Sequence, residues 1–252
     1  MGFLAISVVA RWSPSLIALV SGNTVGNAGG GVFGECGAGT RCGSSGVTLT
    51  SSTVSGNTAG KDGGGIFNDA FHQSIVTFIN STVSGNTAGS GYSGGGVLSD
   101  GTTGNEVTLV SSILAGNVAG GTANDCEMSS GSATASYSLI QASAKACGVT
   151  DGASNNRVGV NLRLAVLADN GCATLAGTAC VQTHALQAGS LALDTGSNPN
   201  DLITDQRGDG YPRQRSNGID MGAFEGESNT GAQQTATSNC RIDITCSDPA
   251  KL

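Results

Sequence analysis

The feature that most constrains this chain is a repeat built around the tripeptide Ser-Gly-Asn. Three copies align directly and a fourth is degenerate: SGNTVGNAGGGVFGE from Ser21, SGNTAGKDGGGIFND from Ser55, SGNTAGSGYSGGGVLSD from Ser84 and AGNVAGGTAND from Ala115. Measured on the asparagines, the period is 34, 29 and 31 residues. A period of this length is typical of a solenoid or a propeller.

The residues within each unit favour strands over helices. Gly and β-branched residues dominate, and no apolar stripe with a 3.6-residue period is present. Each unit offers about three short β-prone pieces, of the type V-T-L, S-T-V and G-I-F, separated by Gly or polar corners. A propeller blade would need four hairpin-linked strands, and the hairpin turn signals are missing. The sequence therefore predicts an all-β, right-handed parallel β-helix with about three short strands per turn.

Two features of the repeat predict how the turns would stack. The asparagines of successive units (Asn23, Asn57, Asn86 and Asn117) are expected to form a ladder in which each amide bonds to the next. The glycine runs are expected at corners that require a positive φ or a close backbone approach.

Composition limits the functions open to the chain. The net charge of −7 argues against a sequence-independent role on nucleic acid. The apolar stretches near the N-terminus are interrupted by Arg11 and Pro14, so no membrane span is expected. We interpret residues 1–20 as the start or cap of an array whose natural head is missing. Open strand edges at such an end turn would favour self-association.

The eight cysteines fall into four near pairs. An even count with local pairing favours disulfides formed in an oxidising compartment over a zinc site, because CxxC spacing is absent and only two histidines exist. The expected pairs are Cys36 with Cys42, Cys126 with Cys147, Cys172 with Cys180, and Cys240 with Cys246.

The second half of the chain carries an ordered series of motifs. After Asp125-Cys126 come YSLI (137–140), LADNG (167–171), THAL (183–186), GSLALDTGS (189–197), TDQRGDGYPRQR (204–215) and GIDMGAFE (218–225). This order resembles the choice-of-anchor Q domain of bacterial β-helix surface proteins, and the resemblance covers roughly residues 20–226. It implies a bacterial origin, secretion and display on the cell surface, but it supplies no active site.

We therefore divide the chain into four segments. After the start (1–20) come regular β-helix repeats (21–126), irregular C-terminal β-helix turns similar to choice-of-anchor Q (127–226) and a polar tail with a cysteine pair (227–252). Within the third segment, Asp205, Arg207 and Asp220 are expected to tie down the closing turns through charge-assisted hydrogen bonds. Arg207-Gly208-Asp209 also matches a cell-adhesion tripeptide, for which we prefer the same structural role.

A carboxylate stands four residues after the last glycine of each run. If these positions stack at the strand spacing of ~4.8 Å, they form a column of acids along one edge. Its members would be Glu35, Asp69, Asp100 and Asp125.

The column permits three interpretations. The acids could be ordinary residues of solvated turns. They could bind sugar hydroxyls or calcium, with Asp69 and Asp100 as calcium ligands. They could also hydrolyse glycosides, with Asp69 and Asp100 as the catalytic pair, since two-carboxylate hydrolysis uses separations in the same range. A lyase is less favoured, because only Arg41 and Lys61 could supply its base.

One further motif, Gly91-Tyr92-Ser93-Gly94-Gly95, matches the G-x-S-x-G pattern of hydrolases, with His72 one turn earlier. It lies in a glycine-rich corner rather than on a strand-to-helix elbow, which argues against a nucleophile.

Our main hypothesis is a secreted or cell-surface β-helix protein that acts as an adhesion, carbohydrate-binding or structural module. Its partner would be a polysaccharide or another cell-surface ligand. The alternative is a polysaccharide-degrading glycoside hydrolase that uses the carboxylate column.

Overall fold

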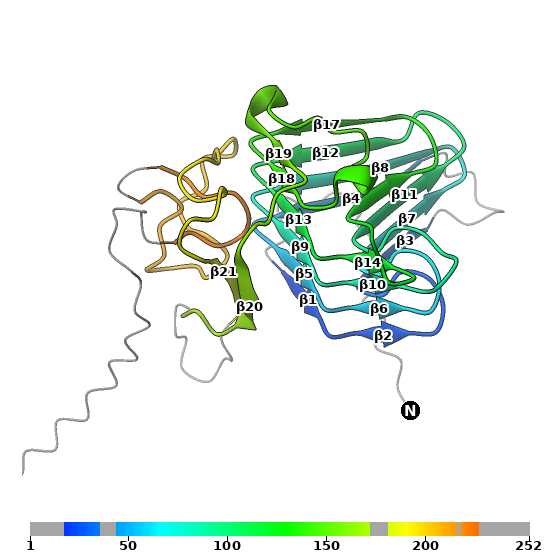
Figure 1. The fold of residues 1–252 in the computed structure, drawn as a ribbon, viewed down its shortest axis with the longest axis horizontal. Coiled ribbons are helices and arrows are strands. Elements are labelled where there is room, and N and C mark those ends of the chain that lie inside the picture. Colours follow the sequence, from blue (N-terminus) through cyan, green and yellow to red (C-terminus); the bar gives the residue numbers. More distant parts are fainter. Residues whose placement is uncertain (1–17, 36–43, 172–180, 216–217, 227–252) are drawn as a thin grey trace, which may run out of the picture.

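The repeats stack as a parallel β-helix in a computed structural model that describes residues 18–35, 44–171, 181–215 and 218–226 (Figure 1). Four sheets run along the stack, and successive strands of the chain visit them in turn. Every pairing within the sheets is parallel except that of β14 with β15. The predicted all-β parallel β-helix is confirmed.

The first two sheets use short strands. Sheet 1 contains β1 (Leu19–Ser21), β5 (Thr53–Ser55), β9 (Thr82–Ser84), β13 (Ile113–Ala115), β18 (Leu139–Ile140) and β19 (Arg157–Val158). Sheet 2 contains β2 (Thr24–Val25), β6 (Thr58–Ala59), β10 (Thr87–Ala88), β14 (Val118–Ala119) and β15 (Thr122–Ala123).

The other two sheets carry the longer strands. Sheet 3 contains β3 (Val32–Glu35), β7 (Ile66–Ala70), β11 (Val97–Gly101) and β16 (Cys126–Met128). Sheet 4 contains β4 (Ser44–Thr50), β8 (Gln73–Ile79), β12 (Glu106–Val110) and β17 (Ser132–Ser136). Each turn thus holds four strands where the sequence predicted about three. The additional strand is the two-residue Thr-Ala piece of SGNTA, which is too short to show a period of its own.

The core consists of aliphatic columns inside the stack. In β8 and β12 the burial alternates along the strand, so that Val76, Phe78, Val107 and Leu109 point inward and are fully buried. This alternation follows from the two-residue period of a strand. Because the partners stack in register, valine lies over valine and Leu109 over Phe78. The low aromatic content of the sequence therefore suits a core filled mainly by short branched side chains.

The predicted asparagine ladder is present and runs inside the stack. Asn23 donates from Nδ2 to Oδ1 of Asn57 (2.9 Å), Asn57 to Asn86 (2.9 Å) and Asn86 to Asn117 (2.9 Å). From Asn57 onward each Nδ2 also donates to a backbone carbonyl on the sheet 1 strand of the turn before. These amides are buried and satisfied, as burial of polar groups requires.

A serine ladder occupies the corner between sheets 4 and 1. The backbone N–H of Ser52 donates to the hydroxyl of Ser81 (3.2 Å), and the same bond joins Ser81 to Ser112 and Ser112 to Ser138 (both 3.1 Å). Asn156 closes it by accepting from the Ser138 N–H. This ladder was not predicted, although a Ser-Ser or Asn-Ser dipeptide recurs in its first three turns.

The glycine runs form the corners between sheets 2 and 3, as predicted. The first glycine of each run has a positive φ, with 65° at Gly63 and 67° at Gly94. The last glycine lies against the neighbouring turn. A Cβ on Gly31 would lie 2.7 Å from the carbonyl oxygen of Gly65 and 2.9 Å from Nδ2 of Asn57. Only glycine therefore fits both positions.

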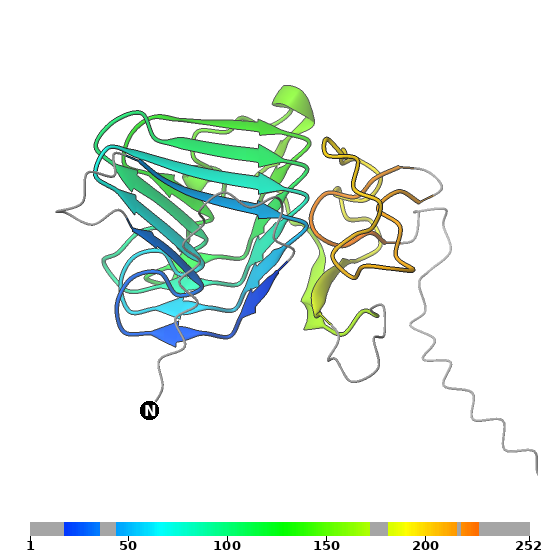
Figure 2. The ribbon, with the colours of Figure 1, turned by 180° about the vertical axis from the view of Figure 1, so that it is seen from behind.

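The stacked turns end at β19, before the middle of the stretch 127–226 that was predicted to form irregular β-helix turns. Two 3₁₀ helices, Ser143–Lys145 and Ala153–Asn155, lie in the last loops. Beyond them β20 (Leu164–Ala168) and β21 (Thr183–Leu186) form a separate antiparallel pair. The described chain from Leu164 to Gly226, which we name the C-terminal lobe, lies beside one face of the stack (Figures 1 and 2).

The lobe covers the outer face of sheet 1. A second hydrophobic cluster fills this interface, and it combines Ile113, Ala115 and Leu139 with Leu162, Leu186, Ala192 and Met221. Polar bonds flank it: the side chain of Gln206 accepts from the Thr53 hydroxyl (2.5 Å), and the Ala223 N–H donates to the Thr82 hydroxyl (3.1 Å). Both faces of sheet 1 are buried as a result, which explains why all residues of β5, β9 and β13 are buried.

Candidate functional site

Three of the four predicted acids stack on sheet 3. Asp100 pairs with Asp69, and Asp69 pairs with Glu35, along the parallel register of β11, β7 and β3. Asp69 and Asp100 are half-buried, while the residues on either side of them point inward and are buried. Both carboxylates therefore face outward, one strand spacing apart, which is ~4.8 Å between neighbouring backbones.

Asp125 does not join this column, so its predicted stacking is wrong. The register pairs Cys126 with Val97 and Met128 with Ser99, which leaves Asp125 beside Gly96 rather than beyond Asp100. The physical reason is that the glycines of the fourth repeat, Gly120 and Gly121, form the turn of the small antiparallel pair of β14 and β15 instead of a corner between sheets 2 and 3. Counting four residues from Gly121 therefore selected the wrong carboxylate position.

Asp125 instead ends the asparagine ladder. Its Oδ1 accepts from Nδ2 of Asn117 (2.8 Å) and from the Asn117 backbone N–H (3.1 Å), while Oδ2 accepts from the Ala142 N–H (2.7 Å). The residue is 1% exposed. Burial raises the pKa of this carboxyl, and the hydrogen bonds from Asn117 and Ala142 oppose that shift. Its role is structural.

An exposed aromatic side chain lies next to the Asp69–Asp100 pair. Phe71 follows directly after β7 and is 59% exposed, and its ring packs edge-on against His72 with centroids 4.9 Å apart. The hydroxyl of Thr102, at the same position on the next turn, donates to the Phe71 carbonyl (2.7 Å). Phe71 was not among the predicted site residues. The feature of the sequence that could have indicated this residue is an aromatic side chain in an otherwise polar corner.

This surface, which we call the acid–aromatic surface (Asp69, Asp100, Phe71, His72 and Thr102), has the chemistry to hold sugars. Carboxylates accept hydrogen bonds from hydroxyl groups, and an exposed ring offers an apolar face. Calcium takes six to eight oxygen ligands, of which this surface supplies the carboxylates of Asp69 and Asp100 and the hydroxyl of Thr102. Among the residues that the structure describes, no three or more His, Cys, Asp or Glu side chains are grouped to hold a metal ion.

The G-x-S-x-G motif forms no catalytic pair. Ser93 lies in the corner loop between sheets 2 and 3, where its backbone N–H donates to Asp62 (2.8 Å) and its hydroxyl bonds to Glu127. His72 lies at the far end of sheet 3 and packs on Phe71. The serine is therefore a part of the corner, as the glycine-rich context indicated.

The Arg-Gly-Asp tripeptide is held inside the lobe. Arg207 is buried between the rings of Tyr211 and Phe224, with centroid distances of 4.1 and 4.0 Å. Its guanidinium pairs with Asp205 at 2.5 Å and donates to the Glu225 carbonyl at 2.6 Å. The arginine is therefore not available to a receptor, and the predicted structural role of Asp205 and Arg207 is confirmed.

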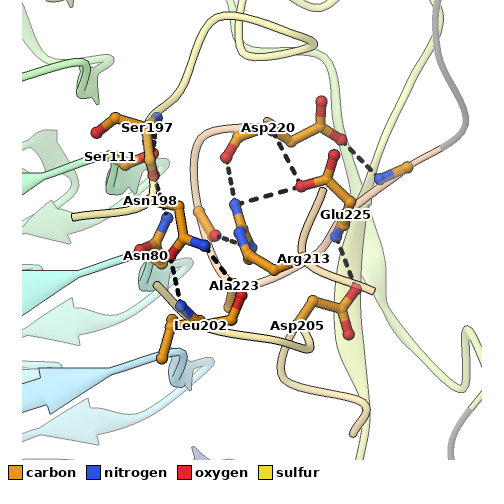
Figure 3. A network of polar contacts seen from close by, with 12 residues as sticks. Asn80, Ser111, Ser197, Asn198, Leu202, Asp205, Arg213, Asp220, Ala223 and Glu225 are labelled. Carbon is orange, nitrogen blue, oxygen red and sulfur yellow. Dashed lines mark hydrogen bonds and ion pairs between the residues drawn. The ribbon is translucent and has the colours of Figure 1, made fainter. Parts of the chain in front are cut away.

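A second buried arginine organises the closing motif GIDMGAFE (Figure 3). Arg213 is fully buried, donates to the carbonyls of Gly222 (2.9 Å) and Asp220, and pairs with Glu225 at 3.5 Å. Asp220 accepts from the backbone N–H of Gly226 (2.6 Å) and Asp194 (2.8 Å). The predicted role of Asp220 in tying down the chain is likewise confirmed.

Burial shifts the pKa values of several groups in this network. Burial, together with the nearby Asp220, raises the pKa of Glu225 to about 8, although Arg213 opposes the shift. Burial also raises the pKa of Asp220 and lowers that of Arg213. Figure 3 shows the network next to the contact between Asn80, Ser111 and Ser197 that attaches the lobe to the stack. The network therefore stabilises the docked lobe.

A serine–histidine contact lies in the interface between the stack and the lobe. Nε2 of His184 lies 2.8 Å from the Ser55 hydroxyl, and Nδ1 lies 2.7 Å from the Ala165 carbonyl. Because a carbonyl only accepts, Nδ1 carries the proton and Nε2 accepts from Ser55. Burial lowers the pKa of His184, which keeps the ring neutral. Both side chains are buried, so the pair joins the lobe to β5 rather than serving a substrate.

One predicted disulfide is present in the described chain. Cys126 and Cys147 are bonded and connect β16 to the loop after the first 3₁₀ helix. An open cleft of about 330 Å³ lies beside this bond, with the Glu127–Lys145 ion pair (2.6 Å) on its wall. The remaining cysteines lie outside the described residues: Cys36, Cys42, Cys172, Cys180, Cys240 and Cys246.

By its fold the chain is a parallel β-helix protein. No protein-family model, curated protein or solved structure matches it. Among the described residues, no helix is long and apolar enough to cross a membrane.

Proposed function

We propose that this chain is an extracytoplasmic binding module that contacts a polysaccharide through the acid–aromatic surface. The observation that carries the proposal is the in-register pair Asp69–Asp100 on the outer side of sheet 3, adjoining the exposed ring of Phe71. Stacked strands present the same groups at a fixed spacing, which suits a ligand that itself repeats.

Two independent features support an extracytoplasmic location. The Cys126–Cys147 bond is of the kind that forms and persists in oxidising compartments. The motif series from LADNG to GIDMGAFE resembles the choice-of-anchor Q domain, and the lobe built by these motifs docks on a β-helix. We therefore infer a secreted or cell-surface protein of bacterial origin.

The binding proposal is tested by measuring the retention of the full chain on neutral and acidic polysaccharides. Removing the ring in Phe71→Ala and one charge in Asp100→Asn should each weaken binding by about tenfold, or ~1.4 kcal/mol. The matched control is Ile203→Ala, which trims an exposed apolar side chain on the lobe, away from the acid–aromatic surface. Equal retention of all variants, or no retention of the unaltered chain on any polymer, would contradict the proposal.

A second candidate, glycoside hydrolysis, is favoured by the same register. The strand spacing of Asp69 and Asp100 is close to the ~5–5.5 Å that separates the two carboxyl groups in retaining enzymes. Release of reducing ends from one polymer, abolished by Asp69→Asn with the fold intact, would support hydrolysis. Binding without release of reducing ends supports the binding module.

A further inference from the structure

One histidine joins the C-terminal lobe to the stack. His184 lies on β21 of the lobe, and its Nε2 accepts a hydrogen bond from the hydroxyl of Ser55 on β5 (2.8 Å). Its Nδ1 donates to the carbonyl of Ala165 on the neighbouring strand β20 (2.7 Å). His184 is 8% exposed, so water has little access to the ring while the lobe is docked.

Among the described residues, no charged side chain faces this ring. The sheet 1 strands β1, β5, β9 and β13 contain no titratable side chain, and neither do β20 and the rest of β21. Burial lowers the pKa of His184 and the hydrogen bond to Ala165 opposes the shift, while no charged neighbour contributes to it. A protonated ring is therefore a buried cation without a counter-charge, which is an unfavourable state.

Protonation also disturbs the hydrogen bond between the lobe and the stack. The neutral ring accepts at Nε2, but an imidazolium carries a hydrogen on both nitrogens and accepts none. The Ser55 hydroxyl then loses its acceptor and has to turn its own hydrogen elsewhere. Because Ser55 is buried, that hydrogen has no ready exchange with bulk water. The contact therefore favours the docked lobe only while the ring is neutral.

The buried carboxyls of the lobe whose pKa values are shifted respond to acid in the opposite direction. Burial raises the pKa values of Asp220 and Glu225, so the folded chain binds these two protons more strongly than the unfolded chain does. Acid therefore stabilises the lobe through both carboxyls. His184 is the described group of the lobe through which mild acid destabilises the docked state.

We propose that His184 is an acid-operated latch: the neutral ring holds the lobe on sheet 1, and the protonated ring releases it. Release uncovers the apolar strip that the lobe buries, which includes Ile113 and Leu139 on the stack. The main core of the stack lies on the other side of sheet 1 and contains no titratable group in its described part apart from the disulfide-bonded cysteines. The proposal goes beyond polysaccharide binding, because the acid–aromatic surface belongs to sheet 3.

The test is hydrogen exchange of the full chain from pH 7.5 to pH 5, corrected for the intrinsic exchange rate at each pH. Below pH 6.5, the ordinary pKa of histidine, the docking equilibrium should weaken by up to about tenfold per pH unit. Protection of β20 and β21 should fall accordingly, while β8 and β12 keep theirs. His184→Gln does not titrate and should remove this pH dependence. The matched control His72→Gln replaces the exposed histidine on the stack and should retain it.

Histidine signals in nuclear magnetic resonance spectra decide the case in which His184→Gln is released at every pH. The chain has two histidines, so the spectrum of His72→Gln assigns the His184 signal, whose titration should coincide with the loss of protection. Full protection of β20 and β21 at pH 5 would overturn the proposal. So would an unchanged acid release in His184→Gln, a His184 titration at a different pH from the release, or an equal loss of protection in β8 and β12.

Discussion

The carboxylate of Asp125 accepts hydrogen bonds from both the backbone and the side-chain amide of Asn117, at 3.1 and 2.8 Å. Asn23, Asn57 and Asn86 each donate to the amide oxygen of the asparagine on the next turn, whereas the Asp125 carboxylate has no hydrogen to donate. Its second oxygen accepts from the Ala142 N–H. The Asp125 carboxylate, which only accepts hydrogen bonds, therefore ends the asparagine ladder.

We expect Asp125→Asn to lower the free energy of unfolding by about 1–3 kcal/mol. The new amide can keep its oxygen toward Asn117, but its NH₂ group then faces the Ala142 N–H, so that two buried donors meet. Urea unfolding followed by circular dichroism measures the change. The control Asp100→Asn alters an outward-facing carboxylate and should stay within about 0.5 kcal/mol. Equal stability of Asp125→Asn and the unaltered protein would contradict this role.

Breaking the Cys126–Cys147 bond should cost about 3 kcal/mol of stability, the loop-closure value for a loop of this size. The two cysteines are separated by 21 residues. Cys147→Ala is the sharper test, because Cys126 is buried in the core and Cys147→Ala leaves its volume unchanged. A reducing agent would also affect cysteines elsewhere in the chain. Thermal unfolding at a fixed redox potential should show a lower midpoint, and an unchanged midpoint would contradict the prediction.

Glu225 should make the protein less stable as the pH rises. Its pKa is about 8 in the folded chain and 4.5 when unperturbed. Between these values the folded chain holds more protons than the unfolded chain, so the stabilisation present below pH 4.5 is lost as the pH rises through 8. The loss is at most about 1.4 kcal/mol per pH unit. Denaturant titrations from pH 5 to 9 measure the slope.

Glu225→Gln should flatten this slope, because the amide does not titrate. The exposed Glu106→Gln is the matched control and should leave the slope unchanged. His184 changes the stability in the opposite direction. Burial lowers its pKa, so its contribution to the free energy of unfolding is lost as the pH falls through that pKa. A slope of the same size in Glu225→Gln would show that other carboxyls produce it.

Arg213→Met should release the lobe while the stack stays folded. The substitution leaves the carbonyls of Gly222 and Asp220 buried without their donor, and an unsatisfied buried acceptor typically costs about 1–3 kcal/mol. Hydrogen exchange should show faster exchange in β20 and β21 and unchanged protection in β8 and β12. Uniform loss of protection across both parts would contradict independent docking. Arg213→Lys should rescue little, because one ammonium does not reproduce the forked donors.

The stack was predictable because its determinants repeat. A feature that recurs once per turn, such as Asn57 over Asn86, appears in the sequence as a period and in the structure as a ladder. The column of Asp69 and Asp100 followed from the same reasoning. The same reasoning failed at Asp125. There the fourth repeat forms an antiparallel pair, so the position four residues after the last glycine is not the stacked position.

The lobe and the acid–aromatic surface were harder to foresee. The contact between Gln206 and Thr53 joins residues 153 positions apart, and no local pattern encodes it. Phe71 is a single exposed ring, which periodicity does not reveal. The motif resemblance pointed to the charged residues of the lobe, but not to its docking on the outer face of sheet 1.

The end of the asparagine ladder also bears on how such an array can lengthen. A duplicated turn inserted before Asn117 would add one more amide that both donates and accepts, so the pattern of bonds would continue unbroken. A turn added after Asp125 would meet an oxygen with nothing to donate. Gain and loss of repeats between related genes should therefore be confined to the stretch upstream of this aspartate, with the disulfide-bonded end and the docked lobe inherited as one unit.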